Sequence, residues 1–194
     1  MKYRITLSLV SIGLLLFGCT TQNVLIKNDG SAVVELFFNP DSESKKGEDV
    51  SDELDSLDYA ELFNEFYSNS DIIEKFMVDS RGKGGYKISY VVTNIDSLGY
   101  YLDPFFGLPI ETKMTTKYFE INGPNGKSNP EDDICGCTDM LKFELNLKFE
   151  KEIKRIKTKN DYVTQVSSKE VLLKTSVGHL NYNKIGNSIK IYFK

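Results

Sequence analysis

Residues 140–149 read Met-Leu-Lys-Phe-Glu-Leu-Asn-Leu-Lys-Phe, and they form the clearest strand pattern in the 194-residue chain. Apolar side chains alternate along this stretch with charged or amide side chains. Successive side chains of a β-strand point to opposite faces of the sheet, so the pattern predicts one buried face and one solvated face. We therefore expect the fold to be built on an antiparallel sheet that has water on one side.

Two hairpins are expected upstream of this strand. Residues 23–27 and 31–39 flank Asn28-Asp29-Gly30, and an Asp-Gly turn between two extended runs is a strong hairpin signal. Residues 72–79 and 86–93 flank a glycine-rich turn, and apolar side chains alternate along the second run. Further strands are expected at 116–121, 151–159, 163–175 and 188–193.

Two helices complete the expected fold. Over Ser51–Tyr67, aromatic and leucine side chains recur at the three- and four-residue spacing of one helical face. A shorter helix is expected to begin after Asn94 and to end before Pro104. The sequence thus predicts one α+β domain, in which an antiparallel, hairpin-rich sheet has one long helix packed on one face and a second short helix.

The N-terminus has the pattern of an export signal. Lys2 and Arg4 precede an almost uncharged run that ends at Gly18. This run is shorter than the roughly 20 apolar residues that a membrane-spanning helix needs, so a cleaved signal peptide is expected at residues 1–18.

Cys19 is the candidate lipidation site. Leu16-Phe17-Gly18-Cys19 resembles the lipobox of bacterial lipoproteins, in which the cysteine sulfur receives a diacylglyceryl group and the cysteine becomes residue one. An ordinary secretory signal with an incidental cysteine is the alternative. We favour lipidation because the charges, the apolar run and the cysteine lie at mutually consistent distances. Residues 19–23 are expected to be a tether close to the anchor, and 19–194 a single domain.

The expected location is the cell envelope. Thr20, Thr21 and Gln22 follow the cysteine, so the aspartate that retains lipoproteins in the inner membrane of enteric bacteria is missing. This favours the outer membrane, on its periplasmic side. The formal net charge of −4 argues against a nucleic-acid partner, which would require a basic protein face.

Two cysteines follow much later, in Cys135-Gly136-Cys137. Such a pair can close a small, strained disulfide in an oxidising compartment, and strained disulfides are the more reactive ones. A redox pair or a metal site is the functional alternative. We favour a loop clip or two inert thiols, because a zinc site needs four ligands and His179 is the chain's only histidine. No metal and no cofactor are expected.

The apolar loop at 100–109 is a candidate surface for a ligand or partner. Tyr100, Tyr101, Phe105 and Phe106 stand in it, although loops are usually polar. Phe105 and Phe106 either contact an apolar ligand or a partner protein, or they close one end of the sheet core. We favour closure of the core.

A basic ribbon lies between Lys151 and Lys159. It either contacts anionic lipid or glycan, or it belongs to a solvated edge strand whose lysines protect against aggregation. We favour the edge strand.

The order of these features, from the lipobox through the Asn28-Asp29-Gly30 turn and the acidic helix to the strand at 145–149 and residues 153–156, resembles small α+β lipoproteins of the Bacteroidota type. Those proteins have no assigned activity. The resemblance therefore implies an envelope lipoprotein, and it transfers no catalytic residue to this chain.

The expected function is non-enzymatic binding of an envelope protein or a ligand. An enzyme needs a nucleophile or a base held by partners, and neither a Gly-x-Ser-x-Gly motif nor a second histidine is present in the sequence. A carrier of an apolar ligand or lipid is one alternative. A carboxylate-based envelope hydrolase is the other, because two suitably spaced acids suffice for that chemistry.

Overall fold

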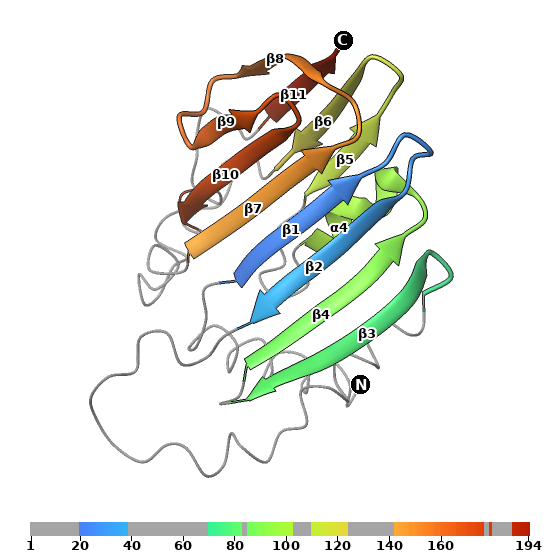
Figure 1. Cartoon of the computed structure of the whole chain (residues 1–194). Helices are drawn as coiled ribbons and strands as arrows, with labels where there is room; N and C mark the ends of the chain where they lie inside the picture. Colours follow the sequence, from blue (N-terminus) through green and yellow to red (C-terminus); the bar gives the residue numbers. More distant parts are fainter. Residues whose placement is uncertain are drawn as a thin grey trace, which may run out of the picture.

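The computed structural model of the chain describes residues 20–38, 70–82, 85–102, 110–123, 142–176, 179 and 188–194. Their strands form two sheets, which face each other (Figure 1). The strands of the larger sheet are β1 (Thr20–Ile26), β2 (Ala32–Phe38), β3 (Ile73–Gly82), β4 (Gly85–Val92), β7 (Lys142–Phe149), β9 (Val163–Ser167) and β10 (Glu170–Ser176). The strands of the smaller sheet are β5 (Glu111–Met114), β6 (Tyr118–Asn122), β8 (Ile153–Thr158) and β11 (Ser188–Phe193).

Both expected hairpins are confirmed. β1 pairs antiparallel with β2, and β3 pairs antiparallel with β4. Gly30 has a φ of 85°, a conformation that glycine adopts at little cost, and this closes the turn between β1 and β2. The Asp29 carboxylate accepts hydrogen bonds from the Ser31 backbone N–H at 2.9 Å and the Ser31 hydroxyl at 2.7 Å. The residues predicted to form this turn therefore do so.

The larger sheet has the order β3-β4-β2-β1-β7-β10-β9. Its centre is a parallel pair, β1 and β7, in which Asn23 lies opposite Asn146. The sequence analysis expected an antiparallel sheet and did not foresee this pairing. The parallel pair joins the two N-terminal hairpins to the strands that come from the C-terminal half of the chain.

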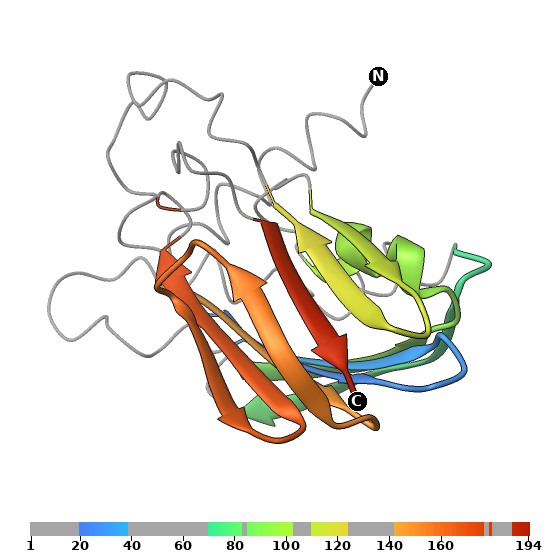
Figure 2. The same cartoon turned by 90° about the horizontal axis from the view of Figure 1, so that it is seen from above.

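The smaller sheet has the order β5-β6-β11-β8 and covers part of one face of the larger sheet (Figure 2). The two sheets share one core. Phe149 of β7 contacts Phe119 of β6 and Phe193 of β11, with ring centroids 5.6 Å and 5.4 Å apart respectively. Alternate residues of β1, β2, β4 and β7 fill the same space and are almost completely buried. The alternation along Lys142–Phe149 thus does separate a core face from a solvated face.

A short helical segment closes one end of this core. The 3-10 helix η2 (Ile95–Ser97) leads directly into α4 (Leu98–Leu102), and the Asn94 side chain accepts a hydrogen bond from the Asp96 N–H. The short helix predicted after Asn94 is therefore confirmed. Gly99 is needed there, because a Cβ atom at this position would lie 2.1 Å from the Ile110 carbonyl oxygen. In the described part of the chain, no helix has the length and apolar character needed to cross a membrane.

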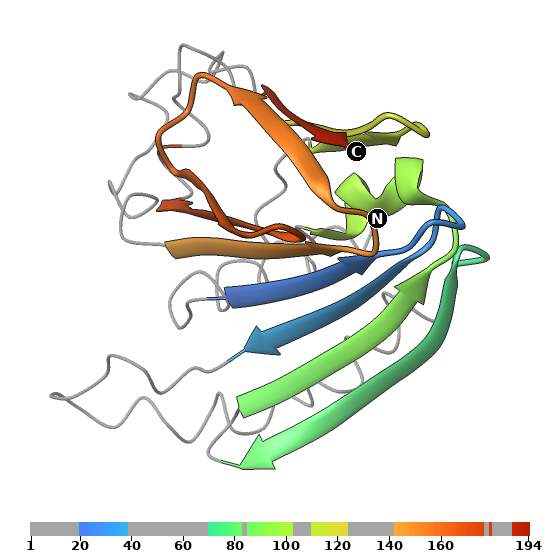
Figure 3. The same cartoon turned by 45° about the horizontal axis from the view of Figure 1, so that its top comes forward.

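The expected fold class is wrong. The described residues form a mostly β protein with two sheets, not an α+β domain with a long helix on one sheet face. The core-facing side of the larger sheet is covered by the smaller sheet and by α4 (Figure 3). The long helix expected over 51–67 lies outside the described residues. The error has a simple cause: alternation identifies strands, but it does not reveal that β5, β6, β8 and β11 form a second layer.

The start of β1 also differs from the expectation. Residues 19–23 were expected to form a tether, yet β1 begins at Thr20. Gln22 is only 2% exposed, between Leu36 of β2 and Leu145 of β7. The domain therefore begins directly after Cys19.

Gln22 gives a test of the core. Its side-chain oxygen is buried without a hydrogen-bond partner, which is costly in an apolar interior. We expect Gln22→Leu, a change of similar volume, to raise the free energy of unfolding by about 1–3 kcal/mol. The measurement is urea denaturation, with a higher midpoint at an unchanged slope.

Asn23→Leu is the matched control on the same strand. Asn23 lies on the outer face of the larger sheet and its side-chain oxygen accepts a hydrogen bond from Asn146 Nδ2, so this change should not stabilise the protein. An unchanged or lower midpoint for Gln22→Leu would contradict this description of the core.

Candidate anion-binding site

Cationic and tyrosine side chains gather on the outer face of the smaller sheet. Lys190 of β11 lies opposite Glu120 of β6 on one side and Lys157 of β8 on the other. The intervening residues of β6 and β11, such as Phe119 and Ile191, are buried in the core, so these polar residues point away from it. We call this surface the basic face; it comprises Lys113, Tyr118, Glu120, Arg155, Lys157, Lys159, Lys190 and Tyr192.

The two tyrosines of the basic face lie under its cations. The Arg155 guanidinium carbon is 4.4 Å from the centre of the Tyr192 ring, and Lys190 Nζ is 4.4 Å from the centre of the Tyr118 ring. The two rings are 5.9 Å apart. Such cation–π contacts hold a cation in place without neutralising its charge.

Two carboxylates lie on this outer face: Glu120 on β6, and Glu111, which stands two residues before Lys113 on the edge strand β5. Lys190 Nζ lies 3.1 Å from a Glu120 carboxylate oxygen. The hydrogen bond to Glu120 raises the pKa of Lys190 above its ordinary value, so this ammonium group stays charged through the physiological range. Glu120 therefore balances Lys190, while no carboxylate among the described residues lies within 4 Å of Lys157 or Lys159.

A groove of about 380 Å³ runs along this surface. Thr158 shapes one end of it, since its hydroxyl donates to the Ser188 carbonyl at 3.3 Å and accepts from the Asn160 N–H at 3.1 Å. The first bond joins the end of β8 to the start of β11, and the second holds the turn that follows β8. The groove is lined by Glu120, Lys157, Thr158, Lys159, Ser188, Lys190 and Tyr192.

The chemistry of the groove suits an anion. Lysine ammonium groups bind phosphate and carboxylate oxygens as point charges, and arginine binds them through a planar fork of donors. The chain as a whole has a formal net charge of −4, so this face is positively charged on a protein that is acidic overall. Charge, hydroxyl groups and a concave surface thus occur together.

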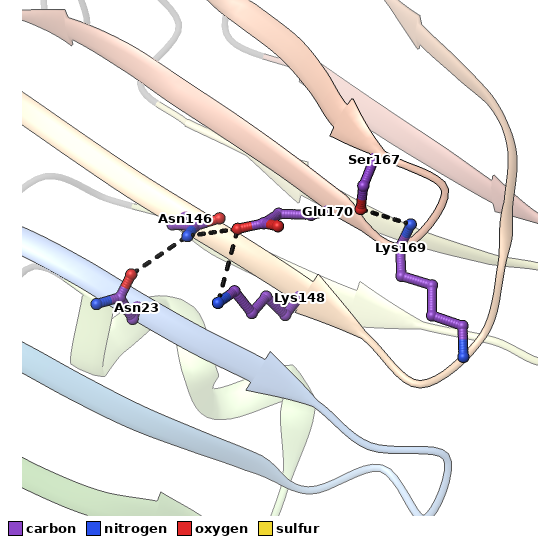
Figure 4. A network of polar contacts seen from close by, with 6 residues as sticks. All are labelled: Asn23, Asn146, Lys148, Ser167, Lys169 and Glu170. Atoms are coloured by element: carbon purple, nitrogen blue, oxygen red, sulfur yellow. Dashed lines mark hydrogen bonds and ion pairs between the residues drawn. The ribbon is translucent and has the colours of Figure 1, made fainter.

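The outer face of the larger sheet is different, because Lys87, Lys148 and Lys174 each lie beside a carboxylate of a neighbouring strand. Lys87 forms an ion pair with Glu35, and Lys174 lies 3.1 Å from Glu144. Figure 4 shows a polar network around Asn146, in which a further lysine, Lys148, lies beside the carboxylate of Glu170. Asn146 Nδ2 donates to Asn23 Oδ1 at 3.3 Å and to Glu170 Oε1 at 2.8 Å, and Lys148 Nζ lies 3.7 Å from the same Glu170 atom. These charges balance one another across neighbouring strands and leave little attraction for an external ion.

The sequence predicted part of the basic face. The lysines between 151 and 159 were assigned to an edge strand, and β8 is indeed the outermost strand of the smaller sheet. The contribution of β6 and β11 was missed. Alternation in both strands separates their polar from their apolar residues, but only the register brings Glu120, Lys190 and Tyr192 beside Lys157.

The candidate aromatic surface at 100–109 is only partly described. Tyr100 is exposed, at 68%, whereas Tyr101 is buried at 6%. The Tyr101 hydroxyl forms a hydrogen bond with the Ser70 hydroxyl, and its carbonyl oxygen accepts a bond from the Tyr90 hydroxyl at 2.8 Å. Tyr101 thus belongs to the core. Phe105 and Phe106 lie outside the described residues.

The remaining candidate residues are distributed elsewhere. Cys19, Cys135 and Cys137 lie outside the described residues. His179 is exposed, and its ring contacts Tyr162 edge to face at 5.6 Å. Within the described ranges, no three His, Cys, Asp or Glu side chains are close enough together to hold a metal ion.

No protein-family model and no curated protein sequence matches the chain. Among solved structures, the chain is similar to the folded domain of LppM from Mycobacterium tuberculosis, determined by NMR. The identity is 12% and the TM-score is 0.46, over 92% of this chain and 91% of that one. A likeness this remote transfers neither the fold nor the function of LppM to the chain. The expected kinship with Bacteroidota lipoproteins stays a prediction.

Glu120→Gln tests whether the basic face attracts anions. Removal of this carboxylate leaves the Lys190 charge unbalanced, and the pKa of Lys190 falls back towards its ordinary value, at which lysine is still protonated at neutral pH. We expect the variant to elute from a heparin resin at a higher salt concentration than the unmodified protein.

Glu144→Gln is the matched control, because it makes the same change in net charge beside Lys174 on the larger sheet. The shift in elution should be larger for Glu120→Gln than for Glu144→Gln. Equal shifts would mean that retention follows net charge alone, and would contradict a local site.

Proposed function

We propose that this protein is a lipid-anchored binding protein of the bacterial cell envelope. Its anchor is the lipid on Cys19, and its binding surface is the basic face of the smaller sheet. It holds an anionic partner without chemical turnover. The observation that carries the proposal is the groove, in which Lys157 and Lys159, with no carboxylate of the described residues within 4 Å, stand beside Lys190 and Tyr192.

The anchor rests on the N-terminal sequence. Lys2 and Arg4, the apolar run and Leu16-Phe17-Gly18-Cys19 have the order and spacing of a lipoprotein signal. Two or three acyl chains at ~0.8 kcal/mol per buried CH₂ hold a protein stably at a membrane. We place it in the outer membrane, facing the periplasm, because no retention aspartate follows the cysteine.

The anionic partner replaces the apolar one that the loop at 100–109 suggested. Tyr101, one residue of that loop, is buried in the core and is not available to a ligand. A carrier of an apolar ligand would need space between the two sheets, where Leu147, Phe119 and their described neighbours are packed together. The groove on the basic face, in contrast, is open to solvent, and lysine, glutamate, serine and threonine side chains contribute to its lining.

Cys19→Ala tests the anchor. Without the sulfur there is no attachment point for lipid, so the variant should lose incorporation of labelled palmitate and should leave the membrane fraction on cell fractionation. The measurement uses cells that express the full chain.

Cys135→Ala and Cys137→Ala are the matched controls, since each removes one thiol and leaves the lipobox intact. Both should keep the label and the membrane association. If Cys19→Ala kept the label, or if the unmodified protein never acquired it, the proposed anchor would be wrong.

A further inference from the structure

We infer that the groove on the basic face binds the phosphate groups of anionic lipids in the membrane that holds the anchor. The inference rests on the proposed anchor at Cys19 and names the partner of the proposed binding surface. Two independent observations lead to it: the position of the groove in the fold, and the charges that line it.

The first observation concerns the end of the molecule at which the anchor enters. β1 begins at Thr20, so a lipid on Cys19 is attached one residue away from the larger sheet. An extended residue spans only ~3.4 Å. Thr20 lies opposite Phe143 at the start of β7, and Lys142 lies opposite Ser176 at the end of β10. This end of the larger sheet is therefore held at the membrane surface.

One end of the groove lies at the same end of the fold. β8 finishes at Thr158, and residues 159–162 lead directly into β9 (Figure 3). The Tyr162 carbonyl accepts a hydrogen bond from the Lys174 N–H at 3.0 Å, close to the end of β10. Lys159 and Ser188, at one end of the groove, are thus brought to the side of the fold where β1 begins.

The second observation concerns charge. Lys157 and Lys159 have no carboxylate partner among the described residues, and Lys190 keeps its proton. Basic residues near an anionic membrane surface gain about 1 kcal/mol each, which is about a fivefold change in binding. A soluble phosphate offers the same oxygens. The headgroup is favoured because the anchor holds the groove beside lipids at a high effective concentration.

Acetylation of lysines tests this inference on the intact lipoprotein. Protein purified from membranes is reconstituted into vesicles of phosphatidylcholine alone, or of phosphatidylcholine with phosphatidylglycerol, and acetylation rates are read by mass spectrometry. We expect acetylation of Lys157, Lys159 and Lys190 to slow about fivefold in the anionic vesicles. Lys27 and Lys169, which lie at the opposite end of the sheet, should react equally in both.

Two arms separate the possible sources of phosphate. Millimolar inorganic phosphate added to the neutral vesicles should leave the rates unchanged. Protection by inorganic phosphate without protection by anionic vesicles would overturn the inference in favour of a soluble ligand. Equal slowing at all five lysines would also overturn it, because it would indicate attraction without a site.

A pair of charge reversals completes the test. In Lys157→Glu/Lys159→Glu, the protection of Lys190 by anionic vesicles should disappear. The matched variant Lys27→Glu/Lys169→Glu makes the same change in net charge and should keep it. Persistent protection in the first variant, with circular dichroism showing both variants folded, would refute the groove as the site.

Failure of this inference differs from failure of the anchor. If Cys19 carries no lipid, the protein does not stay with vesicles of either composition. If the lipid is present and the groove lysines react equally in both vesicles, the anchor stands and the headgroup site is wrong.

Discussion

The parallel pairing of β1 with β7 is the constraint on which the rest of the structure depends. Asn23 and Asn146 lie opposite each other although 123 residues separate them. Closing so long a loop costs conformational entropy, but that cost grows only with the logarithm of loop length. Burial of β1 and β7 side chains such as Val24 and Leu147, each at most 1% exposed, offsets it. Without this pair the larger sheet would divide into two separate parts.

The same pairing would determine how the domain is held if Cys19 carries the proposed lipid. A strand at the centre of a sheet cannot move independently of its neighbours, and β1 has β2 on one side and β7 on the other. A lipid on Cys19 would therefore hold the whole domain through a rigid element and not through a flexible tether. The groove on the basic face has a defined position relative to β1, because residues 159–162 connect the Lys159 end of the groove to the same end of the larger sheet.

The distribution of charge follows from the two-sheet arrangement. Both outer faces bear lysines, but on the larger sheet the neighbouring strands supply carboxylates, as Glu144 does for Lys174. On the smaller sheet Glu120 pairs with Lys190 and Glu111 lies on the edge strand β5, but no carboxylate of the described residues pairs with Lys157 or Lys159, so positive charge is left over there. The sequence predicted those features of the fold that depend on residues close together along the chain. Local patterns predicted the hairpins, the short helix and the edge position of β8. The β1–β7 pair, the second sheet and the groove depend on contacts between distant segments, which alternation and turn residues do not encode.

Depth-dependent quenching on the lipidated protein tests the orientation of the domain most directly. A fluorophore is placed at Asp161→Cys or at Lys169→Cys, in a chain without Cys135 and Cys137, and the vesicles contain lipids with a quencher on the headgroup. The two positions lie at opposite ends of the larger sheet, and the five-residue step from Thr21 to Ile26 alone spans about 17 Å. Strong quenching at position 161 with little at position 169 is the expected result. Stronger quenching at 169, or equal quenching at both, would contradict an anchor that holds the basic groove at the membrane.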